Sequence, residues 1–478
     1  MNSKVIIKHF IYCILLCTIM ASCSSKRQNA TPLNVKPEIY PDYTGVTMPC
    51  NIAPPTFELC QPSDIDKLER LQAVFEAGKN ETVVECNGAD GFCISPDDWQ
   101  LLTQSADVIS ITIQGYDGNK WVEYAPFNIY ISHDSIDSYL TYRLIEPGYE
   151  IWNEISICQR NLETYEEKTI INNKATGGGC INCHSFCNRD ASMMSLHLRK
   201  NNAGTYIVKQ GIANKISPTP SFVYPSWHPQ GRYIAYSQND TKQMFHTTDI
   251  NRIEVFDFHS DIIVYDTQNG DVLTCPQLHS PLAFETFPSW SSDGKYLYYC
   301  SADSVEIPAD YDKAHYSLCR ISFDAATGKF GEKIDTIYNA RTLGGSISFP
   351  RESPDGKWIL YTHHGYGNFS IWHKDADLWM QPTDISTPTP LIKLKSPRSD
   401  SYHTWSSTGK WVVFSSRRED GLYTRPYIMH WDGKTFSKPF PIPQETATHD
   451  KKLLKSYNIP EFTTNAFTAN DALMNALE

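Results

Sequence analysis

The sequence predicts an all-β protein whose larger part is a β-propeller, and three observations support this prediction. Aromatic residues make up 12% of the chain and prolines number 29 among 478 residues, a composition that favours strands and turns over long helices. One strand–turn–strand pattern recurs in clear copies along the second half of the chain. A further hairpin follows each copy, so each period supplies the four strands of a propeller blade.

The recurring pattern begins at an aromatic residue and turns at a glycine. Its copies are "YPSWHPQGRYIAYS" from Tyr224, "FPSWSSDGKYLYYC" from Phe287, "FPRESPDGKWILYT" from Phe349 and "YHTWSSTGKWVVFS" from Tyr402. The turn glycines are Gly231, Gly294, Gly356 and Gly409. Glycine permits the positive φ of a tight hairpin turn, and the aromatic and β-branched residues that follow it are typical of buried strands.

These four copies resemble the TolB-like β-propeller repeat, a relative of the WD repeat, over residues 190–440. The resemblance implies a ring of about five or six blades within residues 191–445. We expect a fifth, degenerate copy at residues 192–211 and expect the C-terminal tail, residues 446–478, to close the ring. The resemblance also implies a docking platform for a protein or glycan of the cell envelope.

The N-terminus has the features of an export signal. Lys4 and Lys8 precede the apolar run "FIYCILLCTIMA", which is too short to span a bilayer and has the length of a signal-peptide core. The following "MASC" resembles the lipobox of bacterial lipoproteins, although Met20 stands where that family usually has leucine. The resemblance implies that residues 1–22 are removed and that Cys23 carries the lipid. A plain secretion signal and an uncleaved anchor are the alternatives.

A lipoprotein of this kind would be periplasmic and membrane-anchored through its lipid, and we expect it at the outer membrane. Residues 23–45 are then predicted to form a polar tether. Because the periplasm is oxidising, Cys50 with Cys60 and Cys86 with Cys93 are candidates for local disulfides.

Residues 46–170 show no repeat. Their apolar and polar residues alternate between turn signals, which predicts a β-rich N-terminal domain shaped like a small immunoglobulin-type sandwich. Within it, Ser95 at an N-cap and Pro96 at the first helical position predict a short helix over "SPDDWQLLTQSA".

Residues 171–190 contain "GGGCINCHSF", whose C-x-x-C-H spacing predicts one covalent haem c. The thiols of Cys180 and Cys183 would add to the two haem vinyl groups, and His184 would ligate the iron from the same side. A disulfide between the two cysteines, a zinc site that also uses Cys187, and a chance match are the alternatives.

The sixth iron ligand is sought in "SMMSLHLR". Read as a strand, this segment places Met194, Leu196 and Leu198 on a core face, because side chains alternate along a strand. His197 and Met193 lie on the other face and are the first and second candidates for the distal ligand. An ordinary strand position for each, or an open iron site, is the alternative.

The predicted function is that of a lipid-anchored periplasmic monohaem cytochrome, with the propeller as the docking domain for a redox partner protein. It would act in electron transfer or redox sensing and would be an electron carrier rather than an enzyme. One alternative is a propeller that binds an envelope protein or glycan without a redox role. Another is a haem enzyme or ligand sensor with an open iron site. The net charge of −12 and the scattered basic residues argue against nucleic acid as a partner.

Overall fold

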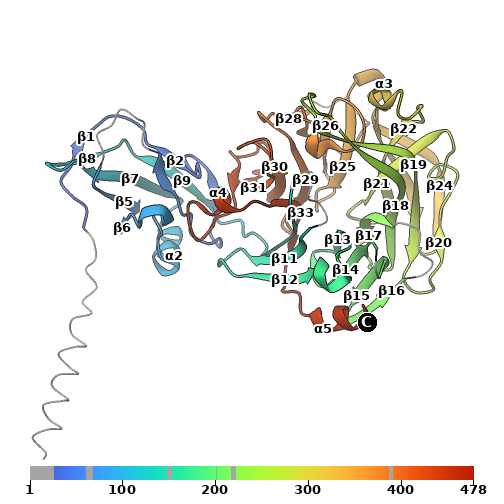
Figure 1. Cartoon of the computed structure of the whole chain (residues 1–478), viewed down its shortest axis with the longest axis horizontal. Helices are drawn as coiled ribbons and strands as arrows, with labels where there is room; N and C mark the ends of the chain where they lie inside the picture. The colour runs from blue at the N-terminus through green and yellow to red at the C-terminus, as the bar shows by residue number, and fades with distance from the viewer. Residues whose placement is uncertain are drawn as a thin grey trace, which may run out of the picture.

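The computed structural model of the chain describes residues 26–60, 68–147, 153–200, 202–216, 222–386 and 391–477. The predicted signal peptide, residues 1–22, and the predicted lipidation site, Cys23, lie outside these ranges. A smaller N-terminal domain lies beside a ring of β-sheets (Figure 1). No helix in the described ranges is both long and apolar enough to cross a membrane.

The ring consists of six antiparallel sheets of four strands each, which confirms the all-β prediction. We number these sheets as blades. Blade 1 contains β33 (Ser456–Thr463), β10 (Tyr139–Ile145), β11 (Ile155–Asn161) and β12 (Glu167–Asn172). Blade 2 contains β13 (Ile181–Cys187), β14 (Asp190–Leu198), β15 (Gly204–Lys209) and β16 (Ile212–Lys215). Blade 3 contains β17 (Val223–Trp227), β18 (Tyr233–Phe245), β19 (Ile253–Asp266) and β20 (Val272–Leu273).

The other three blades follow in chain order. Blade 4 contains β21 (Ala283–Trp290), β22 (Tyr296–Asp303), β23 (Ser317–Asp324) and β24 (Lys329–Tyr338). Blade 5 contains β25 (Ser346–Glu352), β26 (Trp358–His364), β27 (Asp377–Pro382) and β28 (Ile392–Leu394). Blade 6 contains β29 (Asp400–Trp405), β30 (Trp411–Ser416), β31 (Arg425–His430) and β32 (Phe440–Pro441). The short helices between and after them are η3 (Asn173–Thr176), η4 (Tyr311–Lys313), α3 (Ala340–Leu343), η5 (Ser370–Trp372), α4 (His449–Lys452) and α5 (Asn470–Asn475).

The inner strands form a closed circle. β13, β17, β21, β25, β29 and β33 contact one another in that order, and β33 also contacts β13. Closed in this way, the six sheets make a β-propeller without a free edge at the joint. The joint lies in blade 1, where β33 from the end of the chain pairs with β10.

The blade boundaries differ from the sequence expectation in two places. Residues 139–170, assigned above to the N-terminal domain, and the first two residues of the segment 171–190 supply three strands of blade 1. The segment 171–190, treated above as a separate haem-attachment segment, contains β13, the inner strand of blade 2. The degenerate copy expected at 192–211 supplies β14 and β15 of the same blade.

Every inner strand contains a β-bulge at the same position. Registers shift there in blades 2 to 6, and β10 shifts opposite β33 in blade 1. The bulged residues have φ between 52° and 54° and are Cys183, Tyr224, Phe287, Phe349, Tyr402 and Ile459. Four of these side chains meet at the propeller axis, with ring centroids of consecutive blades 4.6, 4.1 and 4.9 Å apart. We call Tyr224, Phe287, Phe349 and Tyr402 the aromatic plug.

The N-terminal domain is built on one seven-stranded mixed sheet rather than on the two facing sheets expected of a sandwich. Its strands are β1 (Thr31–Pro32), β3 (Thr47–Pro49), β5 (Arg70–Ala77), β6 (Asn80–Glu85), β7 (Val108–Tyr116), β8 (Trp121–Glu123) and β9 (Phe127–Ser132). A two-stranded ribbon, β2 (Glu38–Tyr40) with β4 (Glu58–Cys60), and the turn η1 (Gly88–Asp90) complete it. The expected helix is α2 (Pro96–Ser105), where the Ser95 hydroxyl accepts a hydrogen bond from the Asp98 amide.

The predicted tether is largely part of this domain. β1 pairs with β8, and the side chains of Ile39 and Tyr43 are buried. One hydrophobic cluster includes Tyr43 and Ile131 of the N-terminal domain together with Trp411 of blade 6. Because the two parts share this core, they pack as one unit.

Candidate functional site: the axial cavity

The C-x-x-C-H motif lies on the propeller axis, in register with the blade repeat. Cys183 is the bulge residue of β13, at the position that Tyr224 occupies in β17. "CHSF" of blade 2 therefore stands where blade 3 has "YPSW". The motif is part of a blade, and this register was the signal that sequence reasoning missed.

His184 is buried without a well-formed hydrogen bond to any described residue. Its side chain is 2% exposed, and its ring nitrogens lie near the backbone of Ile459 and Thr141 without good hydrogen-bond geometry. Burial lowers the pKa of His184 to about 3, so its imidazole is neutral. His403 occupies the same register position in blade 6, and its Nε2–H donates to the Leu360 carbonyl oxygen at 3.0 Å. Of these two histidines, His403 thus has a hydrogen bond to one ring nitrogen, and His184 has none of good geometry.

Cys180 lies away from the axis. It belongs to the hydrophobic cluster that joins blades 1 and 2, among residues such as Ile157 and Leu198. Burial raises the pKa of the thiols of Cys180 and Cys183, so both are protonated. Cys183 and His184 line the axial cavity described below, whereas Cys180 does not. A macrocycle bonded to both sulfurs would require Cys180 to leave the core, so the three residues as placed here do not fit one haem-attachment surface.

The disulfides and the zinc site considered above are not formed in the described residues either. All eleven cysteines in the described residues carry free thiols, including Cys180 with Cys183, Cys50 with Cys60 and Cys86 with Cys93. No group of three or more metal-ligating side chains is gathered anywhere in the described ranges, which leaves the zinc alternative without a site. The buried Cys187 has its thiol 3.8 Å from the His228 carbonyl oxygen.

The distal-ligand candidates lie on the expected strand face but away from the cavity. Met194, Leu196 and Leu198 belong to the core between blades 1 and 2, as the alternation predicted. The Nδ1 atom of His197 lies 2.9 Å from the Thr205 hydroxyl of the neighbouring strand, and burial lowers the pKa of His197 to about 4. Met193 packs against the hydrophobic cluster of blade 3. Neither residue lines the cavity.

A cavity of about 360 Å³ lies on the axis, with the aromatic plug among its walls. Its size is within the range of small-ligand sites, roughly 300–1,000 Å³. Inner strands of all six blades contribute to it. Two positions after each bulge, the residues lining it are Ser185, Ser226, Ser289, Arg351, Thr404 and Glu461.

The residue types at these six positions differ between the blades. Four blades carry a serine or threonine there, whereas blade 5 carries Arg351 and blade 1 carries Glu461. A third charge, Arg189, enters the cavity from the turn between β13 and β14. Sequence reasoning missed these three residues, because their positions become comparable only when all six inner strands are in register.

The tryptophans of the repeat act as anchors between blades. The Trp227 indole N–H donates to the Ser185 carbonyl oxygen of blade 2 at 3.2 Å. The Trp405 indole N–H donates likewise to the Arg351 carbonyl oxygen of blade 5 at 3.2 Å. Trp227 and Trp405 therefore each hold the preceding inner strand while their rings form part of the cavity wall, whereas the Trp290 indole N–H has no partner in the described residues.

The carboxyl groups of the cavity are perturbed by burial. Burial raises the pKa of Glu461 to about 7, opposed by a hydrogen bond from the Phe186 amide at 3.0 Å and by Arg351 and Arg189. Burial also raises the pKa of Glu352, which accepts a hydrogen bond from the Tyr298 hydroxyl at 3.0 Å. At neutral pH Glu461, which faces both arginines, is therefore not fully ionised.

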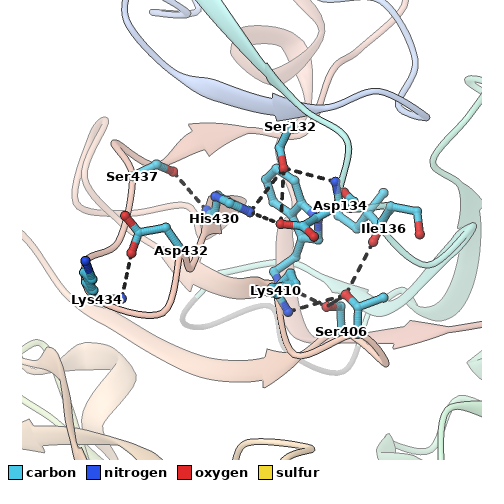
Figure 2. Close-up of polar contacts among 12 residues, drawn as sticks. Ser132, Asp134, Ile136, Ser406, Lys410, His430, Asp432, Lys434 and Ser437 are labelled. Atoms are coloured by element: carbon cyan, nitrogen blue, oxygen red, sulfur yellow. Dashed lines mark hydrogen bonds and ion pairs between the residues drawn. The ribbon is translucent and has the colours of Figure 1, made fainter. Parts of the chain in front are cut away.

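A serine, a histidine and an aspartate also meet at the junction of the two parts of the protein, but not as a catalytic triad. Figure 2 shows Ser132 and Asp134 on the same side of the His430 ring. Both contact the same nitrogen: Nε2 lies 3.2 Å from the Ser132 hydroxyl and 2.9 Å from the Asp134 carboxylate. In a triad the acid and the serine bind opposite ring nitrogens. The Trp411 indole N–H donates to the Asp134 carbonyl oxygen, so this cluster joins the domains.

Comparisons with known proteins give structural matches only. No family model and no curated protein matches the chain. One structural match is a prolyl endopeptidase, with 9% identity and a TM-score of 0.36, over 64% of this chain and 49% of that one. A second is a putative dipeptidyl aminopeptidase IV from Bacteroides ovatus ATCC 8483, with 13% identity and a TM-score of 0.32, over 85% and 54%. A third is an ancestral GH74 enzyme, with 9% identity and a TM-score of 0.22, over 89% and 72%. The chain thus spans about half the length of the first two, and matches this weak carry no argument about function.

Proposed function

We propose that the chain is a TolB-like propeller lipoprotein of the bacterial cell envelope that binds a ligand in its axial cavity. It acts as a binding module for an envelope protein or glycan and is held at the outer membrane through Cys23. The observation that carries this proposal is the cavity itself, which lies on the axis with the aromatic plug in its wall. The blade repeat, with its turn glycines and axial bulges, supports the TolB-like assignment.

The cavity has the chemistry of a binding site. Aromatic rings and prolines give it apolar walls, and Ser226, Ser289 and Thr404 add hydroxyl groups. Many small-molecule sites are mostly apolar with a few polar groups that fix the orientation of the ligand. The accessible wall of this cavity is more polar than apolar, which favours a ligand with polar or charged groups. No reaction is assigned to it, because the described residues place no activated nucleophile beside a base there.

Filling the cavity should abolish binding. Ser289 is 4% exposed and lines the cavity, so Ser289→Trp places an indole where a ligand would lie. We expect calorimetric titration of short peptides and envelope oligosaccharides to identify a ligand whose affinity falls at least tenfold in this variant. The matched control is Ser304→Trp, at an exposed loop residue. A ligand that binds both variants equally, or a panel without any ligand, would contradict the proposal.

Covalent haem c is the second candidate, favoured by one observation. A buried imidazole without a well-formed hydrogen bond is what a metal ligand looks like when its metal is absent, and His184 is such a group beside Cys183. Cys180 would have to leave the core between blades 1 and 2 for haem to attach; Cys180 and Cys183 would then hold the group and His184 would ligate its iron. The haem would supply one-electron chemistry, in electron transfer or redox sensing with a partner protein.

A pyridine haemochrome spectrum tests this candidate directly. The protein would be produced in cells competent for cytochrome c maturation, beside Cys180→Ala/Cys183→Ala. If haem is attached, the wild type shows a covalent haem band on a denaturing gel, and the variant shows none. A wild type without haem removes the candidate and leaves the binding module.

A further inference from the structure

We infer that Arg189 and Arg351 form a binding site for a carboxylate group in the axial cavity. The inference rests on the proposed ligand binding and deepens it by naming the chemical class of the ligand. Its basis is that both arginines depart from the blade repeat, and both departures occur at the cavity.

Arg351 brings a charge to a position where four blades have a hydroxyl group. Its guanidinium group lines the cavity and donates one hydrogen bond, to the Pro350 carbonyl oxygen at 2.9 Å. Burial lowers the pKa of Arg351, yet an arginine stays charged at neutral pH. The side chain is half-buried, so water hydrates only part of its charge, and an anion in the cavity would compensate the rest.

Arg189 occupies a backbone conformation that disfavours a side chain. Its φ is +65° and that of Asn188 is +49°, as a two-residue hairpin turn between β13 and β14 requires. Glycine is the usual residue at such a turn position, so a charged side chain there departs from the turns of blades 3 to 6. The Nε–H of Arg189 donates to the Trp405 carbonyl oxygen at 2.8 Å, which holds the guanidinium group at the cavity wall.

Within the described residues, the acidic groups nearby make no direct ion pair with the two arginines. Glu461 is held by the Phe186 amide, and its raised pKa leaves it partly protonated at neutral pH. Glu352 accepts a hydrogen bond from Tyr298. Asp137 and Glu461 act electrostatically on Arg189, and Glu461 acts on Arg351, but none of these contacts is an ion pair. Each guanidinium group therefore keeps donors that can bind both oxygens of one carboxylate.

The aromatic plug supplies an apolar surface within the same cavity, so a ligand with a carboxylate on an apolar or aromatic body matches both surfaces. Two sources share this chemistry. One is a free ligand, such as the end of a peptide chain, and the other is a propionate group of an attached haem. The probe is 3-phenylpropionate, and its uncharged isostere 3-phenylpropanamide is the control ligand.

Calorimetric titration at pH 7 tests the site. We expect 3-phenylpropionate to bind the wild type at least tenfold more tightly than the amide. Arg351→Gln and Arg189→Gln should each lower the affinity for the carboxylate at least fivefold, without changing that for the amide. Arg398→Gln, at an exposed arginine, should change neither. Equal affinity for the two probes, or a carboxylate affinity unaffected by both cavity variants, would overturn the inference while leaving the cavity as a binding site.

Titration of the haem-loaded wild type and of the Cys180→Ala/Cys183→Ala protein distinguishes a haem propionate from a free ligand. If haem propionates occupy the arginines, the haem-loaded wild type should exclude 3-phenylpropionate and the Cys180→Ala/Cys183→Ala protein should bind it. If the carboxylate comes from a free ligand, both proteins should bind it. If neither protein binds either probe and no haem is attached, the carboxylate site is wrong. If the Ser289→Trp panel is also negative, the proposed function fails with it.

Discussion

A chain that ends at Lys455 is expected to lose the cooperatively folded propeller. The truncation removes β33, the inner strand of blade 1, which pairs with β10 and contacts inner strands on both sides. β10 would then present an unpaired edge at the axis, and the ring would be open between blades 6 and 2. Because each blade buries its faces only against its neighbours, opening the ring exposes core on both sides of the gap.

A point substitution measures the same joint in a chain of full length. Phe462 of β33 is fully buried in the cluster shared by blade 6 and the N-terminal domain, so Phe462→Ala should lower the free energy of unfolding by about 3–5 kcal/mol. Leu454 lies just before β33 and is 66% exposed, so Leu454→Ala should change it by about 0.5 kcal/mol or less. Urea denaturation measures both. β33 would be dispensable if Phe462→Ala and Leu454→Ala changed the free energy of unfolding equally. It would also be dispensable if the truncated chain were soluble and unfolded in the same transition as the full-length chain.

The fold was predictable for the blades whose repeat can be recognised in the sequence. Turn glycines such as Gly231 and Gly409 fixed four blades, since a hairpin turn with positive φ restricts the residue type. Blade 2 was found only as a degenerate copy without its inner strand, because its turn uses Asn188 and Arg189, both with positive φ and neither a glycine. Blade 1 was predicted only in its closing strand, since the C-terminal tail was expected to close the ring and β33 does so. Its other three strands were assigned to the N-terminal domain, because the pairing of β10 with β33 leaves no local signature.

The candidate site was predictable only in part, because its residues are defined by position in the ring. Cys183 and His184 were found through their spacing, and both do line the cavity. The spacing did not indicate that β13 has a bulge at Cys183. It also did not indicate that the side chain of Cys180 lies in the core, away from Cys183 and His184. Arg351 and Glu461 belong to no motif, and they stand out only as departures at a position shared by six inner strands.

Glu461→Gln is expected to stabilise the protein at alkaline pH and to change little at acid pH. Burial raises the pKa of Glu461 to about 7, above the value of about 4.3 expected in an unfolded chain. The folded state therefore holds its proton to higher pH than the unfolded state does. The stability that Glu461 contributes is complete below about pH 4, falls as the pH rises towards 7, and is absent above about pH 8.

Glutamine cannot titrate, but its side-chain oxygen can still accept the hydrogen bond from the Phe186 amide. The difference in unfolding free energy between Glu461→Gln and the wild type should therefore grow by about 2 kcal/mol between pH 5 and pH 8. Glu332→Gln, at an exposed glutamate of β24, is the control and should show no such growth. Urea denaturation at pH 5, 6.5 and 8 measures the difference, in which groups common to both proteins cancel. A pH-independent difference would mean that Glu461 is fully ionised at neutral pH, and the arginines would then already have their counter-ion.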